Sequence, residues 1–100
     1  MLEIIKSSTF DTWLRSLRDR KAKARIEVRI RRLALGNAGQ HRVLKGGIRE
    51  LKVDYGPGYR IYYSLRGQTL VLLLCGGDKS TQSLDLKFAQ RIAEQWKNQS

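Results

Sequence analysis

Cysteine is almost absent from this sequence, which contains only Cys75 among 100 residues. A single cysteine cannot form a disulfide within the chain, and Cys75 ends an apolar stretch where a buried thiol behaves as a small hydrophobic side chain. Long hydrophobic runs are absent too, since the longest, Leu70 to Cys75, is far shorter than the roughly 20 residues of a membrane-spanning helix. Glu3 and the polar residues 6–9 argue against a secretory signal. We therefore expect a cytoplasmic protein.

Histidine is equally scarce, with His41 as the single one. One histidine, one cysteine and no cluster of carboxylates provide too few ligands for a metal enzyme, so we expect no metal and no cofactor. No phosphate-binding glycine loop precedes a predicted helix, which argues against a nucleotide hydrolase. A nucleophilic Cys75 is disfavoured, because a reactive thiol needs an exposed electropositive site, usually with a histidine beside it.

Acidic residues are few: nine Asp and Glu against twenty Lys and Arg give a formal charge of +11. Such a surface attracts polyanions at long range. Nucleic acid, the ribosome, an anionic membrane and an acidic protein all remain open as targets on charge alone.

The length of 100 residues and the 41% hydrophobic content favour one domain spanning residues 1–100. A short apolar segment at 1–5 is interpreted as a strand, and Ser8 with Asp11 has the spacing of a capping box, which predicts a helix start. Two apolar sets then recur every three or four positions and predict a helical hairpin ending near Gly36. The first set is Phe10, Trp13, Leu14 and Leu17, and the second is Ala22, Ile26, Ile30 and Leu33.

From residue 42 the apolar period changes to two, which is typical of strands. We predict strands over 42–45, 48–55, 59–65 and 69–75, and the last is apolar enough to be covered on both faces. The sequence Gly56-Pro57-Gly58 suits a turn with proline at its second position and glycine at its third.

A last helix is predicted to follow, capped by Ser80 or Thr81 and running to about Lys97. Its inner face would carry Asp85, Ala89, Ile92 and Trp96. The order of elements is β-α-α-β-β-β-α, or has a fourth later strand if the short segment 42–45 is counted, and the short connections between the later strands predict an α+β fold. We expect a small twisted antiparallel sheet with an N-terminal helical hairpin and a C-terminal helix.

Basic residues gather first in the predicted helical hairpin, where nine of them stand against Asp19 and Glu27 between positions 14 and 32. This density is typical of contact with a phosphate backbone, although a solvated helical face would look the same. We favour the functional interpretation, because an excess of like charge destabilises a small fold. The nine are Arg15, Arg18, Arg20, Lys21, Lys23, Arg25, Arg29, Arg31 and Arg32.

A second basic group lies on and beside the predicted strands. Because side chains alternate across a strand, Arg60 and Tyr62 share one face, while the apolar Leu51 and Val53 point inward and leave Lys52 on the outer face. We therefore expect Lys52 and Arg60 to stand together on an open cationic face, close enough to hold one phosphate group. The group comprises Lys45, Arg49, Lys52, Arg60 and Lys79.

Two stretches carry a resemblance to a known family: residues 49–63 read RELKVDYGPGYRIYY, and residues 72–82 read LLLCGGDKSTQ. They strongly resemble the phage Gp49-like, HigB-type branch of the RelE/ParE toxin superfamily, and the likeness covers essentially the whole chain. It implies the toxin of a type II toxin-antitoxin system that enters the ribosome and cleaves messenger RNA. It also implies an antitoxin partner of the HigA-like, helix-turn-helix type, and no membrane.

The resemblance further implies roles for individual residues. Arg60 would hold the scissile phosphate, Lys79 would stabilise the leaving group, and Lys52 would activate the attacking 2′-hydroxyl. Lys45 and Arg49 would be auxiliary RNA contacts, and the hairpin cations Arg15, Arg18, Lys21 and Arg25 would contact RNA or the ribosome.

One departure from the family concerns base stacking. The stacking tyrosine of RelE is replaced here by Ser83-Leu84-Asp85, so we expect Tyr62 or Tyr55 to stack on a base.

Two further residues are auxiliary candidates for the site. HigB toxins use histidines, so His41 could take part in the reaction or could be a solvated loop residue. Asp78 could orient Lys79 or Arg60, or could cap the turn before the last helix.

Two other functions compete with the nuclease. A ParE-like poison of DNA gyrase has the same fold, and fold alone does not decide function. A non-catalytic basic RNA-binding module is the third alternative. We favour the nuclease because Lys52, Arg60 and Lys79 are expected to share one concave site.

Overall fold

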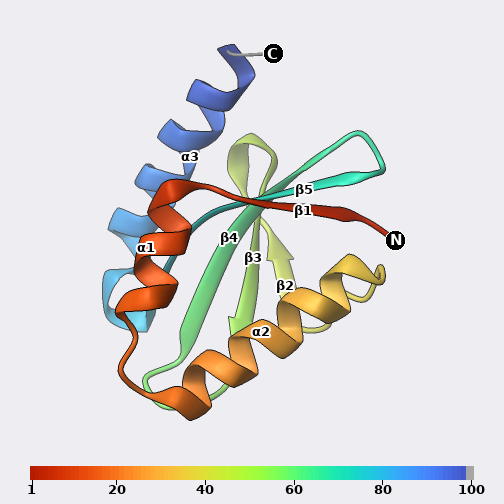
Figure 1. Cartoon of the computed structure of the whole chain (residues 1–100). Helices are drawn as coiled ribbons and strands as arrows, with labels where there is room; N and C mark the ends of the chain where they lie inside the picture. Colours follow the sequence, from red (N-terminus) through yellow and green to blue (C-terminus); the bar gives the residue numbers. More distant parts are fainter. Residues whose placement is uncertain (99–100) are drawn as a thin grey trace.

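The computed structural model describes residues 1–98, which form one five-stranded sheet and three α-helices (Figure 1). The predicted α+β class is confirmed. Short 3-10 turns occupy Lys45–Gly47 and Lys79–Thr81. The elements are β1 (Glu3–Lys6), α1 (Ser8–Ser16), α2 (Arg20–Ala34), β2 (His41–Val43), β3 (Ile48–Val53), β4 (Tyr59–Arg66), β5 (Leu70–Asp78) and α3 (Gln82–Asn98).

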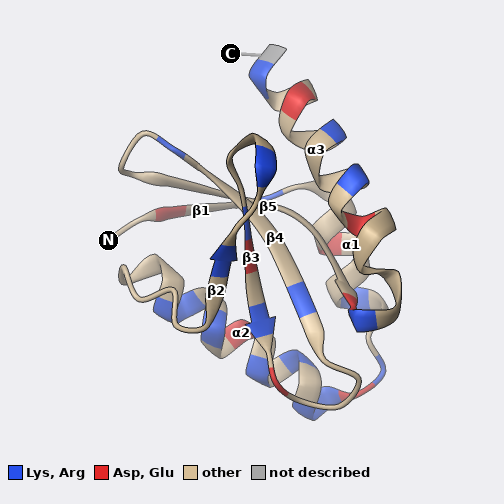
Figure 2. Cartoon of the chain, turned by 180° about the vertical axis from the view of Figure 1, so that it is seen from behind, with Lys and Arg blue, Asp and Glu red and all other residues tan. Residues whose placement is uncertain are grey.

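The strands are arranged in the order β1-β5-β4-β3-β2, with β2 beside β3 at one edge (Figure 2). Strands β2 to β5 pair antiparallel, as predicted. Strand β1 pairs parallel with β5, so the sheet is mixed. A parallel partner needs a long crossover connection, and β1 is separated from β5 by most of the chain.

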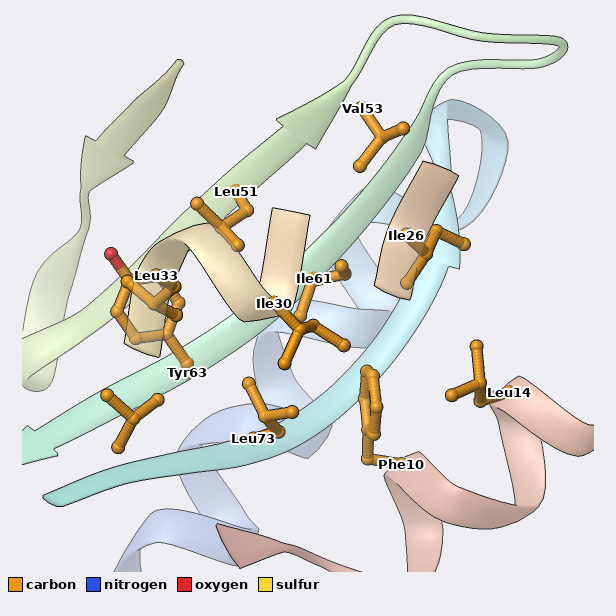
Figure 3. Packing of buried hydrophobic residues seen from close by; sticks show 11 residues of the cluster. Phe10, Leu14, Ile26, Ile30, Leu33, Leu51, Val53, Ile61, Tyr63 and Leu73 are labelled. Atoms are coloured by element: carbon orange, nitrogen blue, oxygen red, sulfur yellow. The ribbon is translucent and has the colours of Figure 1, made fainter. Parts of the chain in front are cut away.

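Helices α1 and α2 cover one face of the sheet with the two predicted apolar stripes (Figure 3). Phe10 of α1 and Ile26 of α2 are wholly buried against this face. The sheet residues that meet them alternate along the strands, as the period of two requires. They are Leu51, Val53, Ile61, Tyr63, Val71 and Leu73.

Helix α3 packs on the other face, against β4 and β5, while β2 and β3 lie farther from it (Figure 2). The predicted stripe of α3 is confirmed, because Ala89 and Ile92 are buried. The prediction that this face is open is wrong, since Tyr62 beneath α3 is wholly buried. The physical reason lies in β5, whose apolar residues Leu72 and Leu74 also point to this face and must be covered.

Two helix caps lie one to three residues before the predicted positions. The cap of α1 is Ser7 instead of Ser8: its hydroxyl accepts a hydrogen bond from the Phe10 N–H at 3.0 Å and donates one to the Leu74 carbonyl at 2.6 Å. The last helical segment is capped by Asp78 instead of Ser80 or Thr81.

The turn between β3 and β4 also differs from the prediction. The Gly58 N–H donates to the Tyr55 carbonyl at 3.1 Å, which places Gly56 second and Pro57 third in the turn. Gly56 has a φ of +58°, a conformation that glycine adopts at little cost. The hairpin therefore uses glycine to reverse the chain where proline was expected.

Candidate functional site

A polar hollow of about 270 Å³ opens on the α3 side of the sheet, next to β2 and β3. We call it the sheet hollow. Three strands and the start of α3 contribute to it, and its residues are Gln40, His41, Arg42, Glu50, Lys52, Arg60 and Gln82. Lys52 pairs directly with Arg60 in the register of β3 and β4. The prediction that these two cations share a face is confirmed.

Glu50 forms the centre of the hollow and is only 1% exposed. Its Oε1 accepts hydrogen bonds from Nε and Nη2 of Arg42, at 3.0 and 2.9 Å, and from Nη1 of Arg60 at 3.0 Å. Its Oε2 accepts one from Nε2 of Gln82 at 3.2 Å. Burial alone would raise the pKa of Glu50, but the hydrogen bond and charge of Arg42 and the charge of Arg60 outweigh it and lower the pKa. The residue is therefore a carboxylate at neutral pH.

Arg60 differs from the prediction, because it is 7% exposed instead of standing on an open face. Its charge is compensated by Glu50, which lies on the same face of β3, two positions before Lys52, the register partner of Arg60. Within residues 1–98, Nε of Arg60 is buried and has no hydrogen-bond partner. Arg60 thus borders the hollow with unused hydrogen-bonding capacity.

Lys79 does not line the sheet hollow. It is exposed and begins the 3-10 turn after β5, where its Cβ lies 3.9 Å from the position that a Cβ on Gly58 would occupy. Of the three cations expected in one concave site, the structure brings Lys52 and Arg60 together in this hollow.

His41 lies in β2 and lines the hollow. Its Nδ1 is 2.8 Å from the carbonyl oxygen of Gly39. Because a carbonyl oxygen only accepts, Nδ1 carries the proton, and in the neutral ring Nε2 is free to accept one. This geometry suits a general base, a role that the sequence alone left as an auxiliary possibility.

Asp78 serves as a helix cap. Its Oδ1 accepts hydrogen bonds from the backbone N–H and the hydroxyl of Ser80, which lower the pKa of Asp78. This is one of the two alternatives that the sequence left open for this residue.

The remaining candidates on the strands lie outside the sheet hollow. Arg49 is on the opposite face of β3, paired with Tyr63, and Lys45 lies in the 3-10 turn before that strand. Tyr62 is wholly buried, so its ring has no exposed face for a base, and burial with the nearby Glu50 raises the pKa of its hydroxyl. Tyr55 is half-buried, with the Arg25 guanidinium 4.7 Å above the centre of its ring.

The cations of the helical hairpin lie on the other side of the molecule, where Figure 2 shows basic residues along α2. Lys21 and Arg25 line a second hollow, of about 520 Å³, which we call the α2 groove. Arg15 and Arg18 are exposed, and Arg15 pairs with Asp11 at 3.2 Å. The full lining of the α2 groove is Lys21, Ala24, Arg25, Val28, Arg29, Arg32, Val53 and Asp54.

Sequence reasoning missed three residues of the sheet hollow: Arg42, Glu50 and Gln82. The sequence did contain a signal for Glu50. It stands two positions before Lys52 on the same strand, so it lies on the face opposite to Leu51 and shares that face with Lys52 and Arg60. Within residues 1–98, no group of three His, Cys, Asp or Glu side chains is placed to hold a metal ion. None of the helices in this part of the chain is long and apolar enough to cross a membrane.

Comparison with known proteins agrees with the resemblance seen in the sequence. Residues 12–97, which include the whole sheet hollow, match the family model described as Phage derived protein Gp49-like (DUF891). An uncharacterized protein of Haemophilus influenzae (strain ATCC 51907 / DSM 11121 / KW20 / Rd) is 47% identical over 94 residues, which are 94% of this chain and 95% of the relative. Family membership suggests a RelE-like toxin. The chain belongs to the phage Gp49-like family, a RelE/HigB-like toxin family.

Proposed function

We propose that this protein is the toxin of a type II toxin-antitoxin system and that it cleaves messenger RNA on the ribosome. The observation that carries the proposal is the sheet hollow, where cations, a histidine and a buried carboxylate surround one space of about 270 Å³. Positive side chains in a partly enclosed site stabilise the negative charge that develops on a phosphate under attack. Family membership is consistent with a RelE-like ribonuclease.

In the proposed reaction the ribose 2′-oxygen attacks the adjacent phosphorus, and the bond from phosphorus to the 5′-oxygen breaks. His41 Nε2 takes the proton of the 2′-hydroxyl, and Lys52 and Arg60 hold the phosphate oxygens. The 5′-oxygen leaves with a proton taken from a water molecule, a 2′,3′-cyclic phosphate remains on the upstream fragment, and the protonated His41 returns its proton to solvent. Lys52 is the alternative group for activating the hydroxyl.

Further contacts extend along the bound RNA and the ribosome. Lys79, which does not line the sheet hollow, would stabilise the leaving group from the turn after β5, and Lys45 and Arg49 would be auxiliary contacts. The exposed hairpin cations Arg15, Arg18, Lys21 and Arg25 would meet ribosomal RNA. A HigA-like antitoxin would hold the toxin inactive.

The test is to incubate purified protein with translating ribosomes and to map message ends by primer extension. We expect His41→Ala and Lys52→Ala each to slow cleavage about 100-fold, the usual order for the loss of one acid–base or charge-stabilising group. Lys87→Ala removes an exposed cation of α3 outside the sheet hollow and serves as the matched control, with unchanged cleavage.

A parallel reaction with DNA gyrase and supercoiled DNA separates the main alternative. Intact message together with gyrase-cleaved DNA would replace the nuclease by a ParE-like poison. RNA binding without cleavage, and with no arrest of growth on expression, would leave a non-catalytic RNA-binding module.

A further inference from the structure

The α2 groove follows one face of α2 through most of the helix. Its α2 residues are spaced by three and four positions from Lys21 to Arg32, so they share one face over roughly 16 Å of helix axis. Val53 and Asp54, at the end of β3, form the opposite wall. The groove is therefore long and open, with the dimensions of a site for a chain segment.

The groove combines an apolar floor with a cationic rim. Ala24 and Val28 provide the floor, and Lys21, Arg25 and Arg32 form the rim together with Arg29. The Arg29 guanidinium donates hydrogen bonds to three backbone carbonyls, and Asp54 in the opposite wall is, within residues 1–98, the one carboxylate of the lining. Burial lowers the pKa of Arg29, and the like charge of the neighbouring Arg32 lowers it further. Like charges gathered along one helix face repel one another.

This charge is not balanced within the molecule. Helix α2 has seven Lys and Arg against one acidic residue, Glu27. Within residues 1–98, ion pairs join Arg15 to Asp11 and join Arg42 and Arg60 to Glu50, so no cation of α2 is in one. A negatively charged occupant would relieve this repulsion.

We propose that the α2 groove binds an acidic amphipathic helix of a partner protein. A phosphate backbone would satisfy the rim but would make no use of the apolar floor. An amphipathic helix uses both, because it lays its apolar face on Val28 and Ala24 while its carboxylates reach the cations on either side. The small side chain of Ala24 allows the two helices to approach closely.

The identity of this partner as an inhibitor rests on the proposed function. The α2 groove and the sheet hollow lie on opposite faces of the sheet, so a helix in the groove leaves the hollow open. It inhibits by covering Lys21 and Arg25, which are proposed to contact ribosomal RNA. An inhibited complex therefore keeps a solvent-accessible His41.

The experiment measures fluorescence anisotropy of a labelled acidic peptide with the full-length protein. The peptide has about 12 residues, roughly 18 Å as a helix, with leucines on one face and glutamates elsewhere. A peptide of the same composition, with its leucines scattered around the helix, is the control for charge alone. We expect the amphipathic peptide to bind at least about tenfold more tightly, because only it covers the apolar floor.

Two double variants locate the site. Lys21→Ala with Arg32→Ala removes two exposed rim cations and should weaken binding about tenfold, as expected for the loss of two surface ion pairs. Arg20→Ala with Arg31→Ala removes the same charge from the same helix outside the groove and should weaken binding less than about threefold. Val28→Asn keeps the charge and should also weaken binding.

The proposal would be overturned if the two double variants weakened binding equally or if both peptides bound equally well. It would also be overturned if a single-stranded RNA oligonucleotide displaced the peptide and if Val28→Asn weakened the binding of that RNA. Because the assay contains no ribosomes and measures no cleavage, a failure of the peptide to bind leaves the nuclease untouched. Loss of cleavage in the ribosome assay likewise leaves the peptide result standing.

Discussion

Replacing Glu50 by glutamine should destabilise the fold by about 3 kcal/mol, because it leaves the buried Arg60 without a compensating charge. Glu50 is 1% exposed and Arg60 is 7% exposed, and their side chains meet at 3.0 Å. Removing one partner of such a pair costs roughly 3–5 kcal/mol. Glutamine keeps one oxygen that can accept from Arg60, so the lower end of that range applies.

Arg42 provides the internal comparison, because it contacts the same carboxylate from the surface. Its side chain is 59% exposed, and an exposed ion pair contributes at most about 1 kcal/mol. Arg42→Ala should therefore destabilise the protein by about 1 kcal/mol or less. For a domain of this size, a loss of about 3 kcal/mol lowers the melting temperature by roughly 12–24 °C.

The assay is urea unfolding at pH 7, followed by the fluorescence of Trp13 and Trp96. A second variant, Glu50→Leu with Arg60→Met, removes both charges and should return to within about 1 kcal/mol of the native protein, because apolar side chains can replace a buried pair. The reasoning would be refuted if Glu50→Gln unfolded at the same urea concentration as Arg42→Ala.

Three further outcomes follow from the geometry and the pKa shifts. Gly76→Ala should lower the free energy of unfolding by about 3 kcal/mol, because its Cβ would lie 2.3 Å from the packed ring of Trp13. Gly47→Ala should lower it by about 1 kcal/mol, because the new Cβ meets open space and only the φ of +75° is unfavourable. Equal losses in urea unfolding would contradict this packing. Burial raises the pKa of Cys75 to about 12, so a thiol reagent at pH 8 should label it only on unfolding, and rapid labelling of the native protein would argue against its burial. The pKa of Glu50 in the folded protein lies below its ordinary value of 4.5, so the ionised side chain stabilises the fold above pH 4.5. This stabilisation is lost as the pH falls through the pKa of the folded state. The free energy of unfolding should therefore drop more steeply below pH 4.5 in the native protein than in Glu50→Gln. Parallel curves would remove Glu50 as the cause.

The sequence predicted well those features that depend on local periodicity. Apolar spacing of three and four identified the inner faces of α1 and α2, including Phe10 and Ile26, because helix geometry fixes which positions meet the sheet. Alternation placed Lys52 and Arg60 together, and the register of β3 and β4 confirms it. The predicted positions of the capping and turn residues were shifted along the sequence, because neighbouring positions offer chemically similar groups, such as Ser7 beside Ser8.

The predictions that were wrong or missing concern features that depend on contacts between distant segments of the chain. Alternation shows that Arg60 and Tyr62 share a face, but it does not show whether a helix covers that face. The cover comes from α3, whose Gln82 reaches Glu50 across 32 positions in the sequence. The parallel pairing of β1 with β5 has the same origin, because no local pattern records which strand a distant segment joins.

The buried ion pair of the sheet hollow needs an explanation other than stability, because an apolar pair of similar size would stabilise the fold at least as well. Under the proposed reaction, Glu50 contributes orientation and charge. Its bonds to Arg42, Arg60 and Gln82 join β2, β4 and α3 and fix the Arg60 guanidinium before RNA arrives. Under the same proposal, three cations and one carboxylate give the hollow a net charge of +2 when His41 is neutral, and this charge attracts the two negative charges of a phosphorane-like transition state more strongly than the single charge of the resting phosphodiester. The carboxylate weakens this positive field, so under the proposal its contribution is the fixed position of the Arg60 guanidinium and not the attraction itself.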